Sequence, residues 1–320
     1  MLDVFLTVDV ELWCDGWDDI DAKFPGAFRQ YVHGVTPTGN YGLPYQLALL
    51  KDHGLTAVFF IEPLFSARFG LPPLTEVVGL VRDGGQEVQL HMHTEWVDEA
   101  LQPLLPSVQG KRQHMRHFSL EEQTRLVSHG VKLIEQAAGG VVTSFRAGSF
   151  GLNRDTLYAL AANGIAFDSS YNATMMGSDS GVMPGVRLVD TIICDGVCEV
   201  PMTVFSDGTR TLRHAQLAAC SRREMEGLLW QALETGRNSF VILSHSAELL
   251  NEARTRADPV VIDRFHKLCA FLDRNRDSFR TRGFAGQRPR VTDSQPQPLA
   301  SPLWKTGARM LEQARRRRYG

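Results

Sequence analysis

Short apolar runs alternate with amphipathic segments along most of this chain, and that alternation restricts the fold more than any other feature. The apolar runs have the length and composition of buried strands, and the segments between them repeat apolar residues at helical spacing. Strands are expected at residues 4–10, 57–61, 87–91, 144–146, 166–168, 199–202 and 240–245. Helices are expected at residues 44–53, 74–82, 120–137, 154–163, 222–234 and 259–275. Strands that alternate with helices predict an α/β fold with a parallel sheet, either open or closed into a barrel.

The composition changes after Gly283, where proline becomes frequent and apolar residues become scarce. This change predicts a flexible proline-rich linker over residues 285–302, behind a single folded domain at residues 1–284. Residues 303–320 are expected to form a short basic amphipathic tail, which includes four consecutive arginines near its end, Arg315–Arg318.

The chain has 320 residues and a formal net charge of -2, without the basic body typical of proteins that bind nucleic acid. We therefore expect no nucleic-acid partner. The five cysteines lack paired spacings, which favours a reducing compartment over a disulfide framework. Without a secretory signal pattern or an apolar stretch of about 20 residues, the expected location is the cytoplasm. The basic tail leaves open a peripheral contact with the inner face of the membrane, and a disordered, solvated tail is the alternative.

Two carboxylates end the first expected strand, in the sequence Thr7-Val8-Asp9-Val10-Glu11. Side chains two residues apart lie on the same side of a strand, so Asp9 and Glu11 face the same way. One carboxylate can then hold a metal ion while the other takes a proton from a water molecule. For this pair alone, a solvated acidic strand end is the alternative.

The third expected strand leads into a cluster of residues that commonly bind metal, His91, His93 and Glu95. Two histidines spaced by two at a strand end can bind one metal ion together. His91 can do so with Glu95 if the chain turns helical after the strand. Polar loop residues without a ligand are the alternative. Imidazole suits zinc and carboxylate suits harder ions, so the mixed set predicts a divalent metal ion without fixing which one.

Three further ionisable residues, Arg146, Asp168 and His245, lie at the ends of expected strands. In a parallel α/β fold the carboxyl ends of the strands meet at one edge, where sites form. At that edge Arg146 can orient the Asp9 carboxylate. Asp168 can tune a nearby histidine, and His245 can act as a general acid. The alternatives are a strand-to-helix turn at Arg146, a helix or turn cap at Asp168 and a structural role for His245.

Taken in order, these segments resemble the five short motifs of the polysaccharide deacetylases, carbohydrate esterase family four. The resemblance runs from about Leu6 to Ser246. It includes the run LALLKDHGLTAVFFI at residues 47–61 and the run GQEV at residues 85–88. That family has a distorted (β/α) barrel. The resemblance therefore implies a single distorted (β/α) barrel of seven to eight parallel strands, with a flexible C-terminal tail.

The resemblance also implies a catalytic role at four positions. Asp9 matches the general base of the first motif, and Arg146 matches the arginine that holds this base. Asp168 lies at the position of the fourth motif, and His245 matches the histidine that donates a proton.

One divalent metal ion is implied as well, with zinc as the first expectation. Glu11 resembles the carboxylate ligand in a D-x-E variant of the first motif, and His91 matches the first histidine ligand. The family pattern has a second histidine four residues later, where this chain has Glu95, whereas His93 is additional. Either His93 or Glu95 can be the third ligand.

The D-x-E and H-x-H-x-E variants look like those of branches associated with surface-glycan or lipopolysaccharide assembly. The implied activity is metal-dependent hydrolysis of an amide, by N-deacetylation or N-deformylation, on an amino sugar of a glycan or glycan precursor. The implied partner is accordingly an N-acylated sugar or glycan precursor. Two other functions stay open: hydrolysis of a small cyclic amide or imide, and glycan binding without catalysis.

Overall fold

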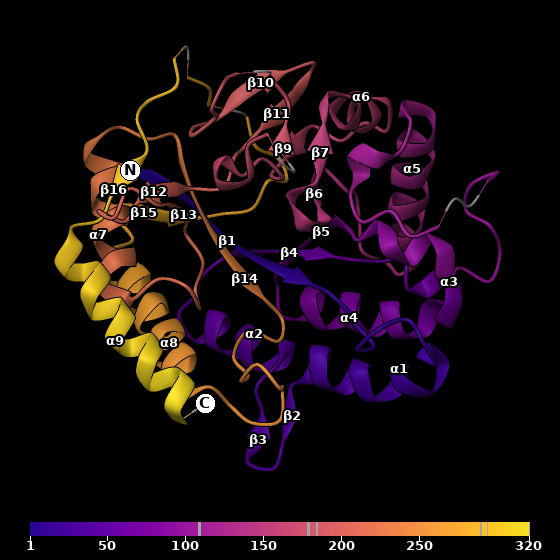
Figure 1. Ribbon diagram of the computed structural model, residues 1–320, viewed down its shortest axis with the longest axis horizontal. Helices are drawn as coiled ribbons and strands as arrows, with labels where there is room; N and C mark the ends of the chain where they lie inside the picture. Colours follow the sequence, from indigo (N-terminus) through magenta and orange to yellow (C-terminus); the bar gives the residue numbers. More distant parts are fainter. Residues whose placement is uncertain (108–109, 178–179, 184, 289, 293, 320) are drawn as a thin grey trace.

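A computed structural model describes residues 1–107, 110–177, 180–183, 185–288, 290–292 and 294–319, and the side chains of residues 315 and 317–319 lie outside this description. Within the described residues a mixed sheet curls through 230° into a half-barrel. Figure 1 shows this sheet at the centre of the molecule, with helices around its outside. The structure confirms the α/β class and the distorted (β/α) barrel expected from the sequence.

The main sheet contains all of the strand regions expected from the sequence. Its strands lie side by side in the order β10 (Ile192–Cys194), β11 (Val197–Glu199), β8 (Phe167–Asp168), β6 (Ser144–Ala147), β5 (Glu87–Met92), β4 (Ala57–Ile61), β1 (Leu2–Val10) and β14 (Ser239–His245). In addition, β15 (Phe279–Thr281) pairs with the first residues of β1. The described pairs are parallel except for the antiparallel hairpin of β10 and β11.

Three strands depart from the expectation, and the causes differ. The strand expected at residues 199–202 is β11, which ends at Glu199, because Pro201 has no amide N–H to continue a ladder. The strands β10 and β15 are each three residues long and are held by their neighbours, so neither gives a clear apolar run.

The helices and the smaller strand pairs complete the fold. The helices are α1 (Ile20–Phe28), α2 (Leu43–Asp52), α3 (Ser66–Phe69), α4 (Leu71–Asp83), α5 (Leu120–Gln136), α6 (Arg154–Ala162), α7 (Arg222–Glu234), α8 (Pro259–Arg274) and α9 (Leu303–Tyr319). The smaller pairs are β2 (Val35–Thr36) with β3 (Gly39–Asn40), β7 (Leu152–Asn153) with β9 (Ser180–Gly181), and β12 (Val204–Ser206) with both β13 (Leu212–His214) and β16 (Leu299–Ala300). A capping box of Ser119 and Glu122 begins α5. Leu126, Leu133 and Ile134 of this helix are buried, as their spacing predicts.

The strands direct their side chains alternately toward the helices and toward the interior of the half-barrel. On β1, Leu6, Val8 and Val10 belong to the main core, which the helices share. Phe5 belongs to a second apolar cluster, with side chains from β4, β8 and β14. Because Asp9 has the same parity as Phe5, β1 directs this carboxylate to the interior side of the sheet.

The segment after β15 returns to the domain. Its short strand β16 pairs with β12, and α9 packs beside α7. Arg309 of α9 is buried and pairs with Asp207 and Glu224. The predicted basic run Arg315–Arg318 lies in this helix, and of its side chains only Arg316 is described. The division into a domain, a linker and a tail stays a prediction. None of the helices that the structure describes is long and apolar enough to cross a membrane.

Candidate active site and metal centre

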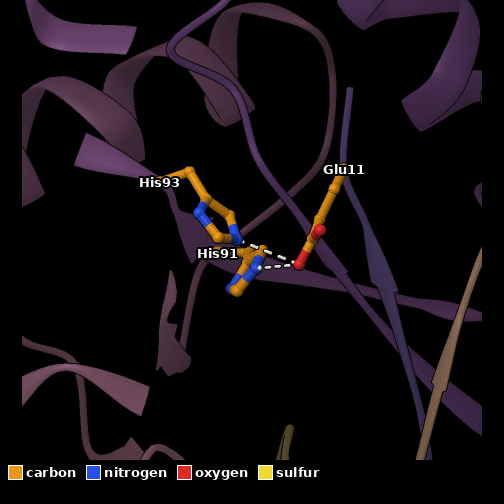
Figure 2. Close-up of side chains that lie close together, drawn as sticks. All are labelled: Glu11, His91 and His93. Atoms are coloured by element: carbon orange, nitrogen blue, oxygen red, sulfur yellow. Dashed lines mark hydrogen bonds and ion pairs between the residues drawn. The ribbon is translucent and has the colours of Figure 1, made fainter. Parts of the chain in front are cut away.

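Two strand ends bring a carboxylate and two histidines together. Glu11 follows the last residue of β1, and β5 carries His91 near its end. The chain then enters a 3-10 turn, η2 (Thr94–Glu99), with His93 at the junction. Oε1 of Glu11 lies 3.1 Å from Nε2 of His91 and 3.0 Å from Nε2 of His93. Figure 2 shows both imidazole rings directed at this one oxygen.

These three groups have the chemistry of a metal site. Their ligand atoms lie within 4.8 Å of one another. Nδ1 of His91 lies 2.8 Å from the backbone oxygen of Arg146, to which it can only donate, so Nε2 keeps its lone pair. Two neutral imidazoles and a carboxylate form many catalytic zinc sites, with a further position left for water or substrate. The residues therefore fit a divalent ion.

The charges around His93 also favour a cation. Burial would lower the pKa of His93, but the charge of Glu11, the hydrogen bond with Glu11 and the nearby charge of Glu95 outweigh it and raise the pKa to about 10. Burial would raise the pKa of Glu11, yet the neighbouring His93 and His91 hold it well below its usual value. A divalent cation would stabilise the negative charge of Glu11 in the same way as a protonated histidine, because it would be the largest local charge in the site.

His93 and Glu95 occupy different places relative to this group. Nε2 of His93 faces Glu11, whereas its Nδ1 lies 3.4 Å from Oε2 of Glu95. The second ring nitrogen of a metal-binding histidine is usually held by such a carboxylate. These positions are the basis for the ligand assignment proposed below.

Gly148 and Trp13 confine the His93 ring. Gly148 follows β6, and a Cβ atom at this position would lie 2.7 Å from Nδ1 of His93. Trp13 stands edge-on to the imidazole with 4.6 Å between ring centroids, and its Nε1 donates to Oε2 of Glu11 at 2.9 Å. The ring therefore has little freedom to turn away from Glu11.

A buried ion pair lies beside the candidate metal-ligand group. Nη1 of Arg146 donates to Oδ1 of Asp9 at 2.6 Å and to Oγ1 of Thr7 at 2.9 Å. Nε of Arg146 donates to the backbone oxygen of Ser169 at 3.0 Å, and the guanidinium lies 4.4 Å from the centre of the Phe60 ring. Because different parts of the planar guanidinium make these contacts, the guanidinium is fixed and holds Oδ1 of Asp9 in place.

His245 lies on the more open side of the site. It ends β14 and is the register partner of Asp9 on β1. Its Nε2 is 3.9 Å from Oε1 of Glu11, and 34% of its side chain is exposed. Burial would lower the pKa of His245, but the charges of Glu11 and Glu248 outweigh it and raise the pKa. This environment favours the protonated imidazole, the form that can donate a proton.

Asp168 is placed differently from the other predicted residues. It is fully buried at the end of β8, where its carboxylate accepts a hydrogen bond from Ser170. Burial raises the pKa of Asp168, and burial together with the Asp168 charge raises the pKa of Glu199 well above its usual value. A proton held between the two carboxyl groups would relieve their repulsion. The contacts described for Asp168 include no histidine, and the next residue, Ser169, connects it to Arg146.

Four further residues contribute to this region but are not among those predicted from the sequence. They are Trp13, Glu62, Glu199 and Glu248. Trp13 binds Glu11, and Glu248 accepts a hydrogen bond from the backbone N–H of His245 at 3.1 Å. Glu62 is fully buried and burial raises its pKa to about 8. Nothing local marks these three. Glu199 differs from these three, because it is a carboxylate within an apolar run. That pattern indicates a buried side chain with a polar partner.

An open cavity of about 700 Å³ lies in front of the site. Its wall includes Asp9, Glu11 and His245, and α9 adds Gln313 and Arg316. The volume lies within the range of about 300–1,000 Å³ that is common for small-molecule sites. A small molecule in this cavity can touch the candidate base Asp9, the candidate ligand Glu11 and the candidate acid His245.

Comparison with solved structures finds proteins that align with most of this chain. A Mycobacterium smegmatis protein, provisionally described as a polysaccharide deacetylase, aligns over 92% of this chain and 94% of its own length, with a TM-score of 0.55 and 17% identity. A family 4 carbohydrate esterase from Streptomyces lividans, solved in complex with acetate, aligns over 87% and 90%, with a TM-score of 0.44 and 14% identity. A pseudoenzyme of the same family from Bacillus anthracis aligns over 87% of this chain and 63% of its own, with a TM-score of 0.43 and 13% identity.

Sequence comparison adds no relative, because no family model and no curated protein matches the chain. The likeness to the Mycobacterium structure shows a common fold. The chain therefore has the polysaccharide deacetylase fold that its motifs resemble.

Proposed function

We propose that this protein, built on the polysaccharide deacetylase fold, is a metal-dependent hydrolase that removes an N-acyl group from an amino sugar. The observation that carries the proposal is the convergence of Glu11, His91 and His93 beside the buried pair of Asp9 and Arg146. The ligand group alone would fit a structural metal, and the ion pair alone would fit a core contact. Together, at an open cavity, they supply a cation site and a proton acceptor within reach of one substrate.

The proposed cofactor is one divalent cation, zinc in the first instance, held by Glu11, His91 and His93. Glu95 would then orient His93 through its second ring nitrogen. When bound, the ion would supply Lewis-acid chemistry, activating a water molecule and stabilising the charge that develops on the amide oxygen.

The protons are moved by residues of the chain. Asp9 accepts a proton from the attacking water, and Arg146 keeps the Asp9 carboxylate directed at the site. His245 donates a proton to the departing nitrogen, so that the sugar leaves as a neutral amine. Because His245 lies on the more exposed side, it can regain its proton from solvent after each turnover.

We also propose that the protein works in the cytoplasm on an N-acetylated or N-formylated glycan precursor. The five cysteines support this location, since all are free thiols. Fractionation of the cells that make the protein tests it, and recovery from an oxidising compartment would contradict it.

A substrate panel run beside elemental analysis of the same samples tests the activity. N-acetylated or N-formylated sugars should release acetate or formate at about one divalent ion per chain. His91→Ala should lose the ion and the activity, whereas His266→Ala, on the exposed surface of α8, should keep both. His93→Ala should lose the ion, and Glu95→Ala should only weaken its binding, by about 10- to 100-fold.

The other outcomes replace parts of the proposal. Full metal retention by His91→Ala would remove the proposed metal site. Turnover of small cyclic amides alone would change the substrate class. Sugar binding without metal and without hydrolysis would make the protein a glycan-binding relative of the enzymes.

A further inference from the structure

The helix α9 is held on the domain through its polar side. Arg309 is 3% exposed and donates to Asp207 and to Glu224, each at 3.1 Å. Thr306, one turn earlier, is buried as well and donates to the backbone oxygen of Asp207. Breaking a buried pair of this kind is costly, so these contacts fix the rotation of α9 about its own axis.

The apolar residues of α9 consequently face solvent. Leu303, Trp304, Met310 and Leu311 are 61%, 59%, 60% and 68% exposed. Their spacing of one and seven residues places them on one side of the helix. A surface helix normally buries its apolar side, as α5 does, so the orientation of α9 is reversed. Figure 1 shows α9, in yellow, at the edge of the molecule beside α8.

The charge of α9 is equally distinct. The whole chain has a formal net charge of -2, but residues 303–319 hold six lysines and arginines and a single glutamate. The buried Arg309 is neutralised by its two carboxylate partners, and Arg316 pairs with Asp258. The remaining basic residues are Lys305, Arg315, Arg317 and Arg318. Basic charge beside exposed tryptophan and leucine is typical of helices that lie in the interface of an anionic membrane.

We propose that α9 docks the protein on a membrane surface that contains anionic lipids. Leu303, Trp304, Met310 and Leu311 enter the headgroup region, while the excess basic charge of residues 303–319 attracts the helix to the anionic surface. Tryptophan is favoured at this depth because its ring is apolar and its indole N–H is polar. A helix that lies in the membrane plane requires no spanning segment.

Docking through α9 bears on the candidate active site. Gln313 and Arg316, near the end of this helix, line the cavity that also contains Asp9 and His245. A docked α9 holds that cavity close to the lipid headgroups. Together with the proposed function, on which this step rests, this position indicates that the substrate is an amino sugar attached to a membrane lipid.

Sedimentation of the full chain with vesicles tests the docking. Binding is expected to vesicles that contain phosphatidylglycerol but not to phosphatidylcholine alone, and it should weaken as salt screens the charges. Leu311→Glu should weaken this binding by about tenfold or more, because a charge replaces an apolar contact with lipid. Leu101→Glu is the matched control, since Leu101 is 67% exposed but follows η2 rather than α9. It should bind like the unaltered protein.

Tryptophan fluorescence gives a second readout. The emission should shift to the blue when anionic vesicles are added, because Trp304 leaves water, and Trp304→Phe should remove the shift. Equal sedimentation of the unaltered protein and Leu311→Glu would overturn the proposal, as would no sedimentation of either. So would a lipid-free dimer that Leu311→Glu dissociates, which would assign this surface to a second copy. His91→Ala should bind vesicles normally, so failure of the catalytic proposal would leave this result intact.

Discussion

Nδ1 of His91 donates a hydrogen bond to the backbone oxygen of Arg146 at 2.8 Å. The side chain of the same arginine holds the carboxylate of Asp9. The backbone of this residue therefore orients the proposed metal ligand, and its side chain orients the proposed base. A substitution that keeps the backbone in place can separate the two roles.

Arg146→Lys should lower kcat while leaving the metal content unchanged. The lysine keeps the positive charge but lacks the planar fork that bonds Asp9, Thr7 and Ser169 at once. Loss of orientation at a catalytic group costs on the order of 10²-fold in rate. Steady-state kinetics and elemental analysis on one preparation measure both quantities. A variant that lost its metal as readily as its activity would contradict the separation.

Asp9→Asn should remove proton abstraction and leave the ion bound. The three proposed ligands, Glu11, His91 and His93, do not include Asp9, and asparagine can still contact Arg146. We expect kcat to fall by the roughly 10²–10⁴-fold that a general base contributes. Glu11→Gln is the comparison, because it should release the metal. If Asp9→Asn released the metal instead, the roles of the two carboxylates would have to be exchanged.

Gly148→Ala should weaken metal binding through His93. The added Cβ would lie 2.7 Å from Nδ1 of His93, a distance that forces the ring or the backbone to move. We expect about 10- to 100-fold weaker metal binding, the size of effect seen when the support of a ligand is lost. Isothermal titration of metal-free protein measures it. Gly79→Ala, on α4 with open space around it, is the control, and unchanged affinity in both variants would contradict the prediction.

Glu199→Gln should make stability less dependent on pH. Burial raises the folded-state pKa of both Asp168 and Glu199 above the usual 3.8 and 4.5. Between these usual values and the raised ones, the folded state binds more protons than the unfolded chain, so stability falls as pH rises from about 4. Removing one titrating group should reduce that fall. Thermal unfolding from pH 4 to 8 should show Tm shifting in favour of the variant at the higher values.

A control variant isolates the cause of that shift. Glu121→Gln removes a carboxylate that is 76% exposed on α5, and its Tm difference from the unaltered protein should stay nearly constant over the same range. Parallel curves for Glu199→Gln and the unaltered protein would show that the buried pair does not control the pH dependence.

The expected elements match the structure best where burial is continuous along the chain. Residues 57–61 are expected as a strand, and β4 has these bounds because each of its residues is buried. The strand β10 exists through a tight hairpin with β11, and β15 exists through pairing with the distant β1, so no apolar run marks either strand. The curvature of the sheet has the same origin, since it follows from the twist between paired strands.

The same distinction, between what the sequence pattern predicts and what depends on the folded chain, applies to the candidate site. Asp9, His91, Arg146 and His245 are predictable as neighbours, because parallel register aligns the ends of their strands. The choice between His93 and Glu95 depends on the η2 turn and on the room that Gly148 leaves, so spacing alone leaves it open. Likewise, the pairing of Asp168 with Glu199 arises where β8 meets β11.

The register of Asp9 with His245 ties the site to the order in which the chain is made. β1 emerges early in synthesis, and its partner β14 emerges only after most of the domain. Until then one edge of β1 is unpaired and the proposed acid is missing, so a nascent chain would carry the proposed metal ligands without the proposed proton donor. Contacts between such distant segments form late and slowly in folding. A fragment that ends before β14 would therefore lack the proposed acid, and the site as proposed is complete only once β14 pairs with β1.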